Sequence, residues 1–148
     1  MAQDELKGRI TAIDTVRGTL EISGVVIDAR HATVRTLAHI PARLEKLRIG
    51  NRVEVEGAFT GPGAFHALEV ERNLGHGGEI VGMLGAVDRA SGTLTVGGIA
   101  VRVPPGASLT DRWHRRVERV EVAEGKRIFC EGEWTGSREF AARIVRTQ

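Results

Sequence analysis

The sequence predicts an all-β protein in which one barrel-like unit occurs twice along 148 residues. Three observations lead to this prediction. The second half of the chain repeats the first, hydrophobic residues alternate with polar ones between glycine-containing turns, and the predicted strands follow one order in both halves. A chain of this length suits one ordinary domain or two small ones.

The internal repeat is the strongest of the three signals. At a shift of 74 residues, the segment from Gly8 to Gly24 recurs, and after one inserted residue the segment from Gly50 to Val70 recurs at a shift of 75. Sixteen identities in one order, with a single gap, exclude chance. We therefore interpret the chain as a tandem duplication with copies at 1–74 and 75–148, joined by the glycine-rich hinge NLGHGG at residues 73–78. The first-copy members of the identical pairs are Gly8, Ala12, Asp14, Gly18, Thr19, Leu20, Gly24, Gly50, Arg52, Glu56, Gly57, Thr60, Gly61, Phe65, Ala67 and Val70.

Each copy contains five predicted strands. In the first copy, residues 7–13 alternate imperfectly and lead into a turn at 14–18, and residues 20–27 then form two strands interrupted by Ser23 and Gly24. Two further strands close the copy. They span 52–58 and 64–71, and their second-copy counterparts span 127–133 and 140–145.

A longer irregular segment separates the third and fourth strands of each copy. It runs from Arg30 to Ile49 in the first copy and from Pro104 to Glu124 in the second. The first segment fits a short helical turn near Leu44, and residues 110–122 of the second read as an amphipathic helix capped by Thr110 or Asp111. Three strands, a crossover and two strands is the order of an OB-type barrel. The sequence therefore predicts two tandem five-stranded OB-like barrels, each with a helical crossover between strands 3 and 4.

Composition excludes several classes of protein. With 41% hydrophobic and 27% charged residues the chain is not disordered, and no run approaches the about 20 apolar residues of a membrane helix. A single cysteine excludes an intramolecular disulfide framework and a multi-thiolate metal site. No signal segment precedes the periodic part, so the chain is either cytoplasmic or a mature exported chain whose signal has been removed.

Two phrases of the first copy carry a resemblance to a known family. GRITAIDTVRGTLEISGVVI and LRIGNRVEVEGAFTGPGAFHALEVER resemble the bacterial Domain of Unknown Function 5666, and the second copy matches less closely. The resemblance implies an OB-like β domain that often occurs in tandem, in members that are frequently exported. It therefore favours a periplasmic or extracellular location. The matched positions are glycines, turn aspartates and core aliphatics, which specify a fold and not a reaction.

The residues that could act as catalytic groups or ligands occur in patterns that indicate structural roles. Asp14 and Asp88 each precede a glycine by four residues, as in a hairpin turn where a carboxylate accepts backbone N–H bonds. Cys130 aligns with Val55 on an alternating strand and is expected to face inward. The five histidines form no short-spaced pair, and no nucleophilic triad or phosphate-binding loop is present. We therefore expect no enzyme activity, no metal and no cofactor.

The expected function is a non-enzymatic binding or structural accessory module that engages another protein or a larger assembly. Phe129 replaces Glu54 at an expected solvent-facing position, which suggests an interface between the two barrels or with a partner. Basic residues gather in the crossovers, with net charges of +4 over 30–48 and +3 over 112–127. The candidate partner-binding residues are Phe129, Phe59, Trp134, Trp113, Arg112, Arg115, Arg116 and Arg119.

Three other interpretations remain open. The residues of 112–119, with Trp113 and Trp134, are an alternative site for a polyanion or single-stranded nucleic acid. A structural interpretation is a solvated helix face with Trp113 packed against its own barrel. A weaker third function is that of a small-ligand or metal carrier. Against nucleic acid, the outward positions of strands 2 and 3 carry no aromatic residue for stacking.

Overall fold

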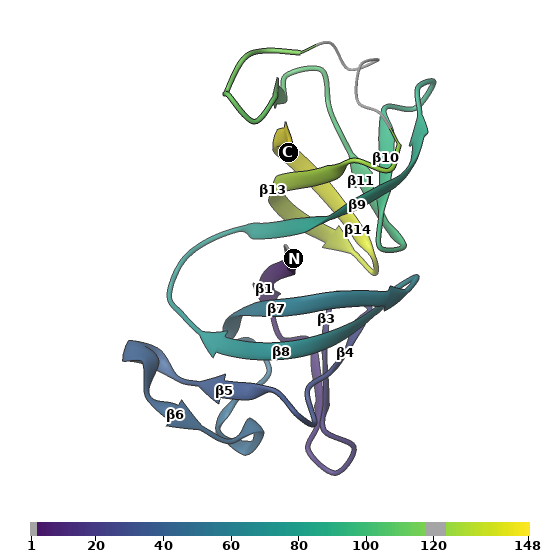
Figure 1. Ribbon diagram of the computed structural model, residues 1–148. Coiled ribbons are helices and arrows are strands. Elements are labelled where there is room, and N and C mark those ends of the chain that lie inside the picture. The colour runs from purple at the N-terminus through teal and green to yellow at the C-terminus, as the bar shows by residue number, and fades with distance from the viewer. Residues whose placement is uncertain (1–2, 118–123) are drawn as a thin grey trace.

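A computed structural model describes residues 3–117 and 124–148 of the chain. Strands make up 59% of these residues, and the described part contains two short 3-10 turns but no α-helix. Figure 1 shows the first half of the chain below the second, with the hinge between β8 and β9 running along one side. The division into domains at 1–74 and 75–148 stays a prediction.

The strands of the two halves correspond closely. Those of the first half are β1 (Asp4–Arg9), β2 (Ala12–Asp14), β3 (Thr19–Ile22), β4 (Val25–Asp28), β5 (Thr33–Arg35), β6 (Pro41–Ala42), β7 (Arg52–Gly61) and β8 (Ala64–Arg72). Those of the second half are β9 (Gly78–Asp88), β10 (Thr93–Val96), β11 (Ile99–Arg102), β12 (Ser108–Thr110), β13 (Arg127–Gly136) and β14 (Glu139–Thr147). The 3-10 turns are η1 (Leu37–His39) and η2 (Leu44–Lys46).

Strand pairing is also matched between the halves. In the first half β2, β3 and β4 pair antiparallel, β4 pairs β8 in parallel, and β7 pairs both β8 and β1 antiparallel. In the second half β9, β10 and β11 pair antiparallel, β11 pairs β14 in parallel, and β13 pairs both β14 and β9 antiparallel. An antiparallel β1–β9 pair joins the two halves into one sheet.

The prediction of two OB-like barrels with helical crossovers is wrong. All the described strands belong to one hydrogen-bonded sheet that continues from one half into the other, and the chain winds as a β-solenoid of about three turns. The alternation and turns within each half carry no information about the pairing of β1 with β9, which joins the two halves. Pairing of β1 with β9 satisfies backbone groups that would otherwise form exposed sheet edges.

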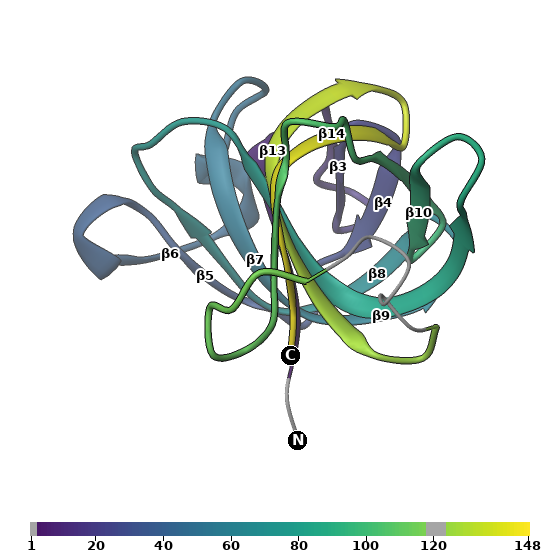
Figure 2. The same cartoon turned by 90° about the horizontal axis from the view of Figure 1, so that it is seen from above.

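The described parts of the crossovers contain strands where longer helices were expected, and of the expected helical segments only the short turn near Leu44 is present there, as η2. In the first half β5 and β6 form a small arm that projects from the body in both views (Figures 1 and 2), with η1 and η2 beside it. In the second half β12 pairs with β14, and a turn follows. His114 has a φ of 64°, which no α-helix accommodates, so the expected helix over 110–122 is wrong in its described part. Residues 118–123 lie outside the described residues.

The hydrophobic core confirms the alternation in the sequence. One cluster of buried aliphatic and aromatic side chains extends through both halves. Val53 and Val55 of β7, with Ile128 and Cys130 of β13, face inward and are fully buried, as expected.

The turn aspartates also have their predicted role. Asp14 Oδ1 accepts hydrogen bonds from the backbone N–H groups of Val16 and Arg17, at 3.1 and 3.0 Å. Asp88 Oδ1 makes the same pair of contacts with residues 90 and 91, and the glycine that ends each turn has a positive φ. These carboxylates therefore shape two equivalent hairpins.

Candidate functional site

The most exposed large aromatic side chain belongs to the turn that follows β12. Asp111 organises this turn, because its Oδ1 atom accepts hydrogen bonds from the backbone N–H groups of Trp113 and Arg115, both at 2.9 Å. The N–H of Val117 donates to the carbonyl oxygen of Leu109 at 3.0 Å and closes the turn at its base. We call residues 111–117 the tryptophan turn.

Trp113 is held at the surface by charged neighbours. Its side chain is 60% exposed, and the guanidinium carbons of Arg112 and Arg115 lie 4.2 and 4.7 Å from its ring centroid. Such cation–π contacts restrain the indole without burying it. The tryptophan turn therefore presents a fixed aromatic surface surrounded by positive charge.

The arginines of the tryptophan turn differ in how far their charge is compensated. Arg115 Nε contacts Asp111 Oδ2 at 2.8 Å. Burial opposes ionisation of Asp111, but hydrogen bonds from Arg115 and Trp113 outweigh it and hold the pKa of the carboxyl below its usual value. Arg112 and Arg116 are exposed and form no ion pair with any residue in the described ranges. Their two charges remain available to a partner.

Phe129 lies two strands away from β12, the strand that leads into the tryptophan turn, although the sequence separates them. On β13 it is directly opposite Arg146 of β14, and Arg146 is in turn opposite Thr110 at the end of β12. The Arg146 guanidinium carbon lies 5.2 Å from the Phe129 ring centroid, and the ring is half-buried. We call Phe129, Arg146 and the tryptophan turn together the aromatic–basic face.

Phe59 and Trp134, by contrast, lie at the junction between the halves. Trp134 Nε1 donates a hydrogen bond to the carbonyl oxygen of Lys7 at 2.9 Å, and Phe59 packs over Gly97. Both rings are half-buried and make edge-to-face contacts with a core phenylalanine of their own half, Phe65 or Phe140. The structure therefore brings Trp113, Arg112, Arg115, Arg116 and Phe129 into one region and places Phe59 and Trp134 elsewhere. The remaining candidate, Arg119, lies outside the described residues.

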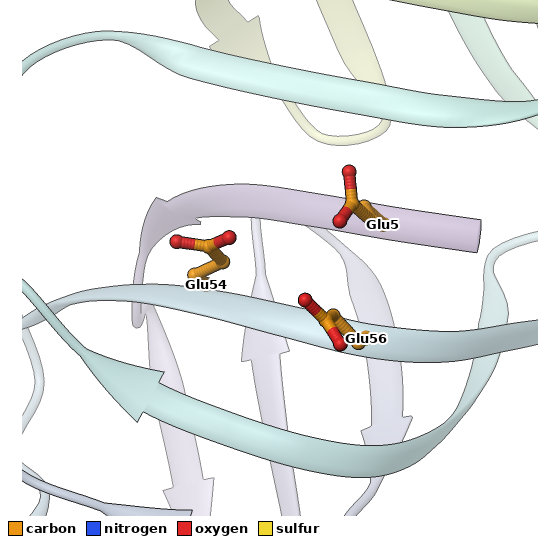
Figure 3. Close-up of side chains that lie close together, drawn as sticks. All are labelled: Glu5, Glu54 and Glu56. Atoms are coloured by element: carbon orange, nitrogen blue, oxygen red, sulfur yellow. The ribbon is translucent and has the colours of Figure 1, made fainter. Parts of the chain in front are cut away.

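Three glutamates form a second cluster, on the first half. Carboxylate oxygens of Glu5, Glu54 and Glu56 lie within 4.8 Å of one another, and Figure 3 shows them on the neighbouring strands β1 and β7. Burial, followed by the neighbouring carboxylates, raises the pKa of Glu5 and of Glu56. The ammonium group of Lys7 compensates part of this charge through Glu54, at 3.8 Å, and through Glu79. Carboxylates can ligate a hard cation, but nothing further here indicates one, and the expected absence of a metal stays a prediction.

Cys130 has no nucleophilic environment. Its side chain is fully buried in the core, and burial raises the pKa of the thiol to about 12. A protonated thiol without access to solvent is a poor nucleophile and a poor metal ligand. The structural role expected for this residue is therefore supported.

Sequence reasoning did not identify the glutamate cluster, nor a group of arginines at residues 9, 52 and 72. Both depend on which residues lie opposite one another on adjacent strands. Glu5 pairs with Glu56, and Arg9 with Arg52. The alternation of the strands located these residues on a face, and only the register between β1 and β7 could have shown that like charges meet.

Comparison with known proteins finds a family match over most of the first half. Residues 7–71 match the model of a family described as Domain of unknown function (DUF5666), which supports the resemblance found in the sequence. No curated protein and no solved structure matches the chain. No helix in the described ranges is long and apolar enough to span a membrane.

Proposed function

We propose that this protein is a non-enzymatic binding module that engages another protein through its aromatic–basic face. The observation that carries the proposal is Trp113, a large apolar side chain that is 60% exposed and restrained by two guanidinium groups. Tryptophan and arginine are the residues most enriched among those that dominate binding energy at protein interfaces.

The surroundings of Trp113 fit such an interface. An interface core needs a restrained aromatic group, because ordering a mobile side chain costs free energy on binding, and here Asp111 fixes the backbone that carries the indole. Phe129 adds apolar surface on β13, two strands from β12. Arg112 and Arg116 add charge that no acidic side chain of the described residues pairs with. The preferred partner is therefore a protein surface with an apolar pocket and acidic rim.

A polyanion or single-stranded nucleic acid is the second candidate. The observation in its favour is the same alternation of arginine and tryptophan, since a base can stack on an exposed indole while guanidinium groups contact phosphates. Only one exposed aromatic ring occurs in the tryptophan turn, and Trp134 lies at the junction, so a run of stacked bases has no continuous platform. We therefore rank this candidate second.

Two further inferences accompany the proposal. We infer that the second half is a diverged copy of the unit matched by the family model, on the basis of the ordered identities and the matched strand pairing of the halves. We also infer a periplasmic or extracellular location, for which the family resemblance is the only support.

The experiment compares the full chain with its Trp113→Ala variant as bait in native cell extract, at low and high salt. We expect a stoichiometric companion protein that survives high salt and whose affinity falls about 30-fold in the variant, the loss typical of a dominant interface residue. Leu74→Ala is the matched control, because Leu74 is also exposed but lies in the hinge.

Two results would count against the proposal. Equal recovery of the companion by both baits would remove Trp113 from the interface. Recovery of nucleic acid that high salt releases would favour the second candidate, because phosphate contacts weaken steeply with ionic strength.

A further inference from the structure

A small cavity at one end of the first half is lined by three arginines. It has a volume of about 110 Å³, and Arg9 of β1, Arg52 of β7 and Arg72 of β8 line it together with the hinge. Each water molecule occupies about 30 Å³ in the liquid, so the cavity has room for one small solute group. The rest of its lining is Gly50, Asn51, Asn73, Leu74 and Gly75, none of which carries a negative charge.

The charges of these arginines are not compensated by any acidic side chain in the part of the chain that the structure describes. Arg9 lies directly opposite Arg52 on the adjacent strand, an arrangement in which like charges repel. None of the three arginines forms an ion pair with any residue of 3–117 or 124–148. Within the same ranges the side chain of Arg72 also makes no hydrogen bond, so all of its guanidinium donors are available.

The equivalent region of the second half lacks these features. Met83 occupies the position of Arg9, Thr147 that of Arg72, and Arg127 that of Arg52. Arg127 is paired with Asp4 at 2.9 Å, whereas glycine occupies the position equivalent to Asp4 beside Arg52. The same strands therefore form in the second half without arginines at the positions of Arg9 and Arg72, so strand formation does not explain these two.

The hinge fixes the geometry of the cavity. Arg52 donates to the side-chain oxygen of Asn73 at 2.6 Å and to the carbonyl oxygens of His76 and Gly77, which ties the hinge to β7. Gly75 packs against the Arg52 guanidinium, where a Cβ atom would lie 3.1 Å from Nη1. Arg9 uses one donor for the carbonyl oxygen of Gly50, at 2.9 Å. Arg52 is thus largely structural, while Arg9 and Arg72 keep donors for a ligand.

We propose that this cavity is a binding site for a small tetrahedral oxyanion of the phosphate type. Guanidinium groups match phosphate oxygens with two parallel N–H donors each, and three adjacent positive charges favour a multiply charged anion over a monovalent carboxylate. The occupant would neutralise the repulsion between Arg9 and Arg52 and accept hydrogen bonds from Arg72. This site is separate from the aromatic–basic face and does not depend on its function.

The test is titration of the full chain with inorganic phosphate, followed by calorimetry and by amide chemical shifts. We expect saturable binding with shifts concentrated at Gly50, Asn51 and Gly75. The variants Arg9→Met and Arg72→Thr introduce the residues of the second half, and each should weaken binding about tenfold or more. Arg17→Met is the matched control, because it removes one exposed arginine of a distant turn and should leave phosphate affinity unchanged.

Three results would overturn the proposal. Absence of saturable shifts in the unmodified chain would exclude the site, whatever the stability of the variants. Equal weakening by Arg17→Met and Arg72→Thr would show that phosphate responds to net charge alone. Acetate binding as tightly as phosphate would exclude selection of a tetrahedral oxyanion.

Discussion

The two halves of this protein place equivalent aromatic residues at their junction but fit them in different ways. Trp134 of the second half lies against Gly8 and Gly78, and Phe59 of the first lies against Gly82 and Gly97. Gly8 and Gly82 are equivalent positions, so each half receives the aromatic ring of the other on the same glycine of its first strand.

The second glycine that each ring contacts is not at an equivalent position in the two halves. Phe59 packs on Gly97, where the first half has Ser23, and Trp134 packs on Gly78, where the first half has Asp4. A Cβ atom at Gly97 would overlap the Phe59 ring, and one at Gly78 would lie 2.7 Å from Trp134 Nε1. Each ring therefore occupies space that is open only because the residue beside it is glycine, at Gly97 for Phe59 and at Gly78 for Trp134.

The backbone of the junction keeps the symmetry that the side chains have lost. Leu6 of β1 lies opposite Ile80 of β9, its own equivalent, so the β1–β9 pair is centred on matching residues. Gly63 N–H donates to the carbonyl oxygen of Gly97 at 2.8 Å, and Arg138 N–H donates to that of Ser23 at 2.6 Å. These two hydrogen bonds are equivalent in the two halves. The main chain therefore resembles a two-fold dimer interface within one chain.

Removal of the junction rings should give the largest effect. We expect Trp134→Ala to lower the free energy of unfolding by about 3 kcal/mol and Phe59→Ala by about 2 kcal/mol, because only Trp134 also loses a hydrogen bond to backbone. Chemical denaturation of both variants measures the two values. A larger loss for Phe59→Ala would contradict the assigned difference between the rings.

A smaller effect is expected when the second half receives the residue of the first at the contact itself. Gly97→Ser should cost about 1–2 kcal/mol, mainly because the new side chain meets the Phe59 ring, with a smaller cost from the positive φ of this position, which Ser23 also adopts. A double-mutant cycle with Phe59→Ala isolates this term. If the cost persists without the ring, backbone strain and not packing is responsible.

The smallest effect concerns the matched carboxylates Glu5 and Glu79. Burial and Glu54 raise the folded-state pKa of Glu5 above its ordinary value of 4.5. The folded protein therefore loses stability as the pH rises through this range and Glu5 becomes ionised. Glu79 instead pairs with Lys7. At pH 7 we expect Glu5→Gln to raise the melting temperature slightly and Glu79→Gln to lower it.

Measurement at pH 4 provides the control for this pair. The increase in melting temperature from Glu5→Gln should be smaller there, because burying a protonated carboxyl costs less free energy than burying a carboxylate. A gain of equal size at both values of pH would show that shape and not charge is responsible.

Several parts of the structure followed from the sequence alone. Alternation identified the buried faces of β7 and β13, including Cys130, and the aspartate–glycine spacing identified both hairpin turns. These features depend on residues close together in the chain, where the two-residue period of a strand and the positive φ of glycine leave few alternatives. The resemblance to the family matched at residues 7–71 was also found in short segments of neighbouring residues.

The prediction of a helix in the second crossover was wrong over residues 110–117, because the local sequence pattern there is weak. The spacing of Trp113, Val117 and Val120 suggested a helix, but Asp111 instead accepts two backbone N–H bonds within a turn, and β12 pairs with β14. Pairing with a strand more than thirty residues away competes with a local helix, and sequence periodicity carries no information about that partner.

The sequence by itself determined the strands outside the crossovers, their buried faces and their hairpin turns, because these depend on neighbouring residues. Only the tertiary structure decided that one sheet joins the halves, that Phe59 and Trp134 lie at the junction, and that Phe129 lies opposite Arg146, which lies opposite the end of β12. It also decided that Arg9 meets Arg52. Each of these depends on strand register, which is set by packing across the whole sheet, and a shift of one residue would reverse the face of every side chain.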